Sequence, residues 1–83
     1  LITDIGTEES CTYILLNGVR NWGINNTKNP DARQSLIDSL LTYSFDRRTA
    51  GYSDCTIKLY STVKALLTEE EINQIQAKGY IIS

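Results

Sequence analysis

A nine-residue segment recurs along the chain, and this recurrence constrains the fold more than any other feature. Residues 11–19 (CTYILLNGV) align without gaps on residues 55–63 (CTIKLYSTV), with Cys, Thr, Leu and Val matching at an offset of 44 (55 minus 11). The pair Gly-Tyr also recurs, at Gly51-Tyr52 and Gly79-Tyr80, each time after a stretch with helical periodicity. The same signals in the same order indicate two successive copies of one structural unit.

Both segments are rich in β-branched, aromatic and aliphatic residues, which predicts strands. In the second copy, apolar residues alternate with Thr56, Lys58 and Tyr60, so one side of the strand is apolar. The alignment extends this assignment to the first copy. We therefore expect one covered face, made by Cys11, Tyr13, Leu15, Cys55, Ile57 and Leu59. The opposite, open face is expected to carry Thr12, Ile14, Leu16, Thr56, Lys58 and Tyr60.

A first helix is predicted from about residue 30. Asn29 can cap it, and Pro30 at the first helical position loses no hydrogen bond. Apolar residues then recur at helical spacing as one stripe: Leu36, Ile37, Leu40, Leu41 and Phe45. We expect the charged run Asp46-Arg47-Arg48 to be a solvated helix end before Gly51.

A second helix is predicted from Thr68. The sequence Thr68-Glu69-Glu70-Glu71 is a capping box, in which the Thr68 and Glu71 side chains accept from each other's backbone N–H groups. Leu67 and Ile72 form the hydrophobic staple that accompanies such a cap. Gly79 supplies a left-handed exit, and Tyr80-Ile81-Ile82 is expected to be a short closing strand.

Strands separated by helices need crossover connections, which imply a parallel sheet. We therefore predict an α/β fold of order β-α-β-α-β, with a short parallel sheet, helices on one face and a solenoid-like stacking of two units. The 83 residues make one domain, with units of about 9–52 and 53–83. Because the chain does not begin with Met, we expect it to be part of a longer protein.

The composition of the chain argues against several classes of function, namely nucleic-acid binding, membrane spanning and catalysis. With 8 Lys+Arg against 10 Asp+Glu, the chain lacks the clustered positive charge that nucleic-acid binding needs. No apolar run reaches the roughly 20 residues that would span a bilayer. The chain has no His, so the commonest general base and zinc ligand are missing. We expect no catalytic residues, no metal site and no cofactor.

The order of strand, helix, Gly-aromatic turn and new strand resembles a leucine-rich-repeat-type β/α segment. More narrowly, residues 35–41 (SLIDSLL), and residues 66–72 (LLTEEEI) through 78–82 (KGYII), resemble terminal segments of bacteriophage virion proteins, including head and tail fibres, and of surface proteins of gut bacteria. The resemblance covers about residues 9–83. It implies an extracellular or virion-borne module for binding or assembly, and it carries over no catalytic residues.

The predicted binding residues are the open-face side chains and one loop aromatic: Thr12, Ile14, Leu16, Trp22, Lys58 and Tyr60. For Trp22, a lid over the core and an interface anchor are both open interpretations. The open face either binds a partner or is covered by a neighbouring domain or a second copy of the chain. Cys11 and Cys55 are expected on adjacent strands in the same register, either as two buried thiols or as a disulfide.

These observations predict a non-enzymatic structural or recognition module. The first hypothesis is a phage fibre or capsid-decoration domain that contacts other virion subunits or a protein or glycan of the host surface, with self-association into a homo-oligomer as one form of that contact. The alternative is a bacterial cell-surface repeat domain that binds protein or glycan ligands. Both hypotheses place the chain on a virion or at a cell surface.

Overall fold

A three-stranded parallel sheet and two longer helices form the framework of the molecule. The computed structural model describes residues 2–16 and 30–83. The strands are β1 (Tyr13–Leu15), β2 (Cys55–Lys58) and β3 (Tyr80–Ile82), and β2 lies between the other two. Both pairings are parallel, so the predicted α/β class and the parallel sheet are confirmed.

Among its described residues, 30–54, the first crossover contains three helical pieces, where the sequence predicts one continuous stripe. Its elements are α1 (Pro30–Ile37), the π-helical turn η1 (Asp38–Thr42) and α2 (Arg47–Ala50). The widened turn closes with a bond from the Tyr43 N–H to the Asp38 carbonyl, 2.8 Å long. Leu36 and Leu40 are fully buried, whereas Phe45 lies beyond the helix in a connecting segment.

The second crossover contains α3 (Ser61–Lys64) and α4 (Glu69–Ala77). The capping box at Thr68 is confirmed, since the Glu71 N–H donates to Thr68 Oγ1 and the Thr68 N–H donates to Glu71 Oε1. Arg33 donates to the same Glu71 oxygen at 2.7 Å, so the cap also joins α1 to α4. The expected strand over residues 55–63 is wrong beyond Lys58, because Tyr60 is the N-cap of α3 and Val63 turns back into the core.

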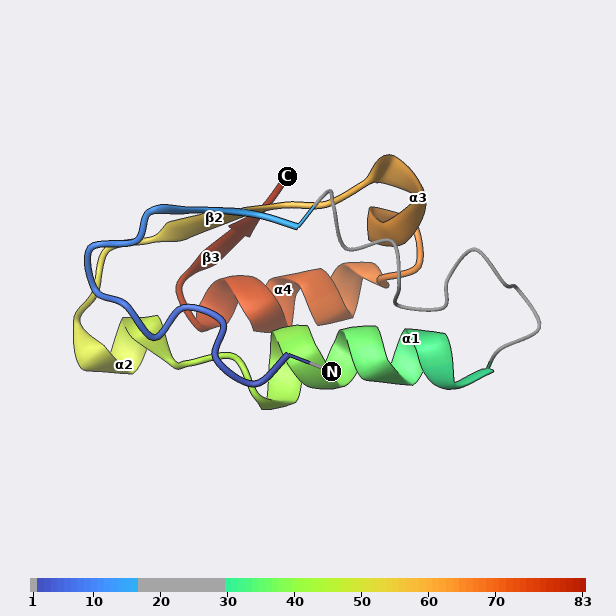
Figure 1. Cartoon of the computed structure of the whole chain (residues 1–83), viewed down its shortest axis with the longest axis horizontal. Helices are drawn as coiled ribbons and strands as arrows, with labels where there is room; N and C mark the ends of the chain where they lie inside the picture. Colours follow the sequence, from blue (N-terminus) through green and yellow to red (C-terminus); the bar gives the residue numbers. More distant parts are fainter. Residues whose placement is uncertain (1, 17–29) are drawn as a thin grey trace.

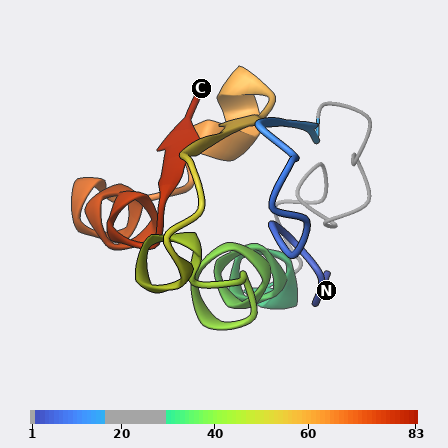
Figure 2. The ribbon, with the colours of Figure 1, turned by 90° about the vertical axis from the view of Figure 1, so that its left-hand side faces the viewer.

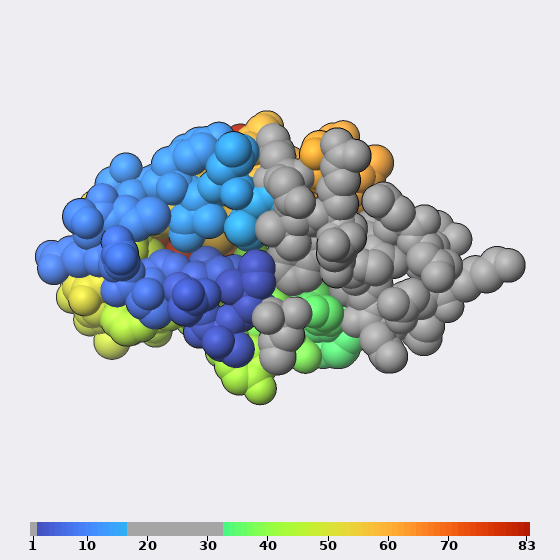
Figure 3. Space-filling model, viewed as in Figure 1, coloured from blue at the N-terminus to red at the C-terminus, as the bar shows by residue number. Residues whose placement is uncertain are grey.

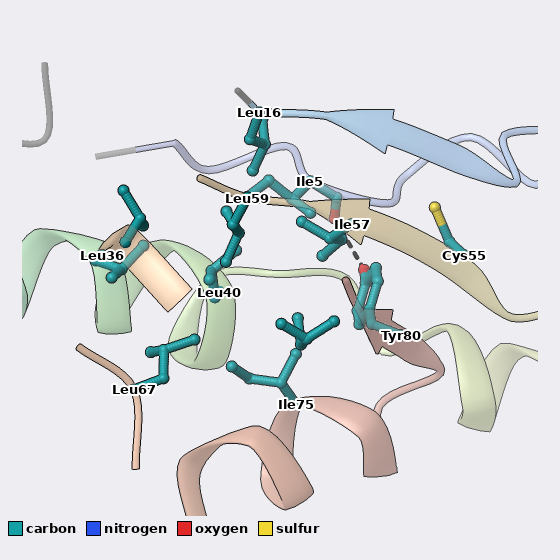
Figure 4. Packing of buried hydrophobic residues seen from close by; sticks show 12 residues of the cluster. Ile5, Leu16, Leu36, Leu40, Cys55, Ile57, Leu59, Leu67, Ile75 and Tyr80 are labelled. Carbon is teal, nitrogen blue, oxygen red and sulfur yellow. Dashed lines mark hydrogen bonds between the residues drawn. The ribbon is translucent and has the colours of Figure 1, made fainter. Parts of the chain in front are cut away.

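The helices cover one face of the sheet. Figure 1 shows α1 and α4 lying below the strands and running along them. Figure 2, which looks along the molecule, shows the strands and the N-terminal stretch curving around an interior that α1 (green) closes from below, while α4 (orange-red) lies beside β3 (red). Side chains from these elements meet there: Leu36, Leu40 and Ile75 face Ile57 and Leu59 across the core (Figure 4).

The register of β1 differs by one residue from the register that the repeat predicts. Tyr13 pairs with Thr56, an offset of 43 (56 minus 13), whereas the alignment predicts 44. A slip of one residue turns every side chain of a strand to the opposite face. The predicted inward placement of Tyr13 and Leu15 is therefore wrong, while the inward placement of Cys55, Ile57 and Leu59 is confirmed.

The sequence gives no indication of a further element, the N-terminal segment (residues 2–11). Figure 3 shows this segment, in dark blue, beside the lighter blue of β1 across one side of the molecule. Its Ile5 is buried in the core, and the Ile5 carbonyl accepts from the Phe45 N–H at 2.9 Å. The Ile2 N–H donates to Ser39 Oγ at 2.8 Å, so both η1 and the stretch after it hold the segment.

Candidate functional site

The sheet face opposite the helices carries large exposed apolar side chains. Tyr13, Leu15 and Ile81 are 55%, 61% and 47% exposed, although all three lie in β-strands. Parallel sheets usually have both faces covered. We call this surface, made by Tyr13, Leu15, Thr56, Lys58 and Ile81, the outer face.

Strand register arranges the outer face in two rows. Tyr13, Thr56 and Ile81 are direct partners across the three strands, and Leu15 is the partner of Lys58. Partners in neighbouring strands lie about 4.8 Å apart and point to the same side. The rows therefore form one continuous surface with apolar side chains at both edges and Lys58 beside Leu15. This surface contains one cation and no acid.

The structure places only some of the residues predicted for the open face on the outer face. Leu16 is buried (8% exposed), and Ile14 is half-buried against the core, so their outward assignment is wrong. Tyr60 caps α3 and packs against the core, which also removes it from the outer face. Thr12 is exposed just before β1, and Lys58 lies on the outer face as expected. Trp22 lies outside the described residues.

Tyr13, Leu15 and Ile81 are the outer-face residues that sequence reasoning missed. Residues 13–16 read Tyr-Ile-Leu-Leu, so alternation alone does not decide which side is apolar. The predicted faces of β1 depend on aligning Cys11 with Cys55, and the one-residue shift in register reverses them. For Ile81, a usable signal was present, because Tyr80 and Ile82 flank it and strand side chains alternate.

A buried arginine fixes the position of the N-terminal segment under the sheet. Arg47 is 0% exposed, so its assignment to a solvated helix end is wrong. Its guanidinium donates to five carbonyl oxygens at 2.7–3.1 Å, those of Gly6, Glu8, Glu9, Cys11 and Ser53. The charge is thus stabilised by carbonyl dipoles, and all donor capacity is used within the protein. Arg47 is a structural residue and has no donor left for an external anion.

The N-terminal segment also contacts β3 through Tyr80. The Tyr80 hydroxyl lies between the Ile5 and Phe45 carbonyls, at 3.1 and 2.6 Å (Figure 4 shows the bond to Ile5). Burial raises the pKa of Tyr80 to about 12. The neutral hydroxyl is therefore the stable form, and it serves as a donor in the core.

A hollow of about 300 Å³ lies between the N-terminal segment and β1. Its apolar wall includes Ile5, Ile14 and Leu16, and its polar lining includes Asp4, Glu8 and Cys11. Cys11 and Cys55 are both free, with Cys11 half-buried and Cys55 fully buried. Burial raises the pKa of the Cys55 thiol, and the neighbouring Cys11 thiol raises it further. The expected identical register of the two cysteines is off by one residue, since Thr56 pairs with Tyr13.

Metal binding and membrane insertion have no candidate elements in the described part of the chain. No group of three or more Cys, Asp or Glu side chains within residues 2–16 and 30–83 is placed to hold a metal ion. Over the same residues, no helix has the length and apolar character to cross a bilayer. Comparisons with protein-family models, with curated proteins and with solved structures give no match.

Proposed function

We propose that this chain is a non-enzymatic binding module whose contact surface is the outer face. The observation that carries the proposal is the exposure of Tyr13, Leu15 and Ile81, at 55%, 61% and 47%, on the two edge strands of a three-stranded parallel sheet. Exposed apolar side chains gathered in this way on one sheet face are typical of interaction sites. The strands hold their backbones in place, so binding requires ordering of side chains only.

The charge on the outer face defines the chemistry of the partner. Lys58 is its only charged residue, and no ion pair to Lys58 is found within the described chain. A second copy of the same face would bring another lysine and no acid, leaving the charges unpaired or opposed. A protein surface with apolar side chains around an aspartate or glutamate is complementary to both properties.

A displayed library of random peptides, selected for binding to the wild-type chain, tests the proposal. We expect the selected peptides to combine apolar residues with Asp or Glu. Their affinity should fall at least about tenfold for Leu15→Ser, the loss typical of one well-buried apolar contact. In a matched selection against Lys58→Glu, we expect basic residues to replace the acidic ones.

Tyr43→Ser is the matched control, because Tyr43 is 49% exposed but follows η1 and does not lie on the sheet. This variant should bind the selected peptides as the wild type does. Peptides that depend on Tyr43 and ignore Leu15 would contradict the proposal, as would selected peptides without acidic residues. Thermal unfolding of each variant verifies that lost binding is not lost folding.

We further propose that the module works in a virion, as a fibre or capsid-decoration domain that contacts a host surface or a neighbouring subunit. This setting is supported by the resemblance of residues 35–41 and 66–82 to terminal segments of phage virion proteins. A bacterial cell-surface repeat domain is the second candidate, supported by the same resemblance. The parent sequence separates them, because a membrane or cell-wall anchor in the same chain contradicts the virion setting.

A two-unit solenoid is the architecture that we propose within the α/β class. In support, each of the two crossovers returns to a parallel strand, and β2 lies between β1 and β3. Repeat stability grows with each stacked interface. A chain with residues 53–83 duplicated at its C-terminus should therefore unfold in one transition at higher urea. Unfolding of the added unit as a separate, early transition would count against stacking.

A further inference from the structure

The chain contains two cysteines, and the fold brings them together from distant positions in the sequence. Cys11 precedes β1, and Cys55 is the first residue of β2. The Thr56 N–H donates to the Thr12 carbonyl at 2.9 Å, which joins the two strands at the residues directly after the cysteines. Positions one residue out of register on neighbouring strands are separated by about 6 Å between Cα atoms. Disulfides form across Cα separations of about 4.4–6.8 Å.

The two thiols differ in access. Cys55 has no exposed surface, and Figure 4 shows its sulfur directed from β2 toward the chain at the start of β1. Cys11 lines the hollow between the N-terminal segment and β1. A small reagent in the hollow therefore reaches Cys11 first.

Backbone bonds fix both residues. The Cys11 carbonyl accepts from Arg47 at 2.9 Å, and the Cys11 N–H donates to the Glu8 carbonyl at 3.1 Å. The Cys55 N–H donates to the Gly79 carbonyl at 3.0 Å. The folded chain thus holds the two sulfurs near each other, which raises their effective concentration above that in the unfolded chain.

We propose that Cys11 and Cys55 form an intramolecular disulfide by exchange with a small-molecule disulfide. The Cys11 thiol loses its proton, and the thiolate attacks one sulfur of the reagent, giving a mixed disulfide and one released thiol. The Cys55 thiol then loses its proton and attacks Cys11 Sγ, which forms the Cys11–Cys55 bond and releases the second thiol. The protein is oxidised by two electrons, the reagent disulfide is reduced to two thiols, and those thiols take up the two protons.

The cross-link is independent of the proposed contact through the outer face. It ties the N-terminal segment covalently to the central strand of the sheet. An oxidising exterior, such as a virion or cell surface, is the type of environment in which such a bond persists.

Cystamine treatment of the folded protein, followed by intact-mass measurement, tests the proposal. For the wild type we expect the loss of two hydrogens without an adduct. Cys55→Ala keeps Cys11 but removes the resolving thiol, so it should accumulate one cysteamine adduct. Cys11→Ser leaves only the buried thiol, and we expect its modification to be at least about tenfold slower.

A cross-link that depends on the fold should also respond to denaturation. In denaturing urea, we expect the ratio of cross-linked to singly modified wild-type chain to fall at least about tenfold, because the effective concentration of the second thiol drops. A stable adduct on folded wild-type protein would overturn the proposal. Covalent dimers as the main product would overturn it too, as would equal cross-linking in native buffer and in urea.

Discussion

Arg47 shows how much one buried side chain contributes when its whole hydrogen-bonding capacity is used inside the protein. Four of its five acceptors belong to the N-terminal segment, and the fifth is the Ser53 carbonyl ahead of β2. Its guanidinium also lies 5.3 Å from the centre of the Tyr52 ring. The residue therefore joins the N-terminal segment, 36–41 residues away, to the stretch just after α2, and its loss leaves the buried Gly6 carbonyl and four part-buried carbonyls without these donors.

We expect Arg47→Ala to lower the free energy of unfolding by about 3–5 kcal/mol, the range for breaking a buried, hydrogen-bonded charge. Arg48→Ala is the neighbouring control. The Arg48–Asp54 pair is exposed on both sides (58% and 50%), so this change should cost about 0–1 kcal/mol. Urea unfolding of both variants measures the difference. Equal losses would show that the buried guanidinium is not the source of stability.

Tyr80 makes the free energy of unfolding fall at alkaline pH. Its pKa is raised from 10.0 to about 12 by burial, so the folded state favours the protonated hydroxyl. This contribution is complete below pH 10 and is lost as the pH rises toward 12, with a total of about 2–3 kcal/mol. Urea midpoints measured across this range should fall for the wild type. Tyr80→Phe should be less stable at neutral pH but should show a flatter decline; a decline as steep as the wild type's would contradict the assignment.

At the scale of elements, signals carried by neighbouring residues were readable from the sequence. The capping box at Thr68 and Glu71, the start of a helix at Pro30 and the closing strand at Tyr80–Ile82 are all present as predicted. Each depends on hydrogen bonds or alternation within a few residues. Because these signals order the elements, they were sufficient for the α/β class and the parallel sheet.

Features set by distant residues could not be read in this way. The face of β1 depends on its register with β2, and the segment Tyr-Ile-Leu-Leu is apolar in both registers. Burial of Arg47 depends on carbonyls 36–41 residues away, which leave no pattern in the local sequence. The sequence pattern therefore predicts the wrong residues of β1 for the outer face, although it places Lys58 of the central strand correctly.

Adjacent leucines in and after β1 test this register directly. Leu16 is 8% exposed and in the core cluster, so Leu16→Ala should cost about 2–5 kcal/mol. Leu15 is 61% exposed, and Leu15→Ala should change stability by no more than about 0.5 kcal/mol. Urea unfolding compares the two variants. A larger loss for Leu15→Ala would restore the register with offset 44 that the repeat predicts.

At the scale of the whole molecule, the N-terminal segment joins the first residues of the chain to the last strand. Gly6 lies directly against Tyr80, because a Cβ atom there would collide with the Tyr80 hydroxyl. Tyr80 in turn bonds to the Ile5 and Phe45 carbonyls. The fold is therefore closed by a contact between residues near its two ends, and the stability of that contact should depend on both.

A double-mutant cycle measures the coupling energy of the contact between Gly6 and Tyr80. Gly6→Ala introduces both the collision and the strain of a positive φ (80°), whereas Gly51→Ala introduces similar strain (φ 76°) with no atom within 4 Å. Gly6→Ala should thus be the more destabilising change. Tyr80→Phe removes the oxygen, the nearest of the Tyr80 atoms that the added Cβ would meet, while two ring carbons still collide with it. Because the collision is relieved in part, we expect a coupling of about 1 kcal/mol with Gly6→Ala and none with Gly51→Ala. Additive losses for both glycines, measured by urea unfolding, would mean that the N-terminal segment is not seated on β3.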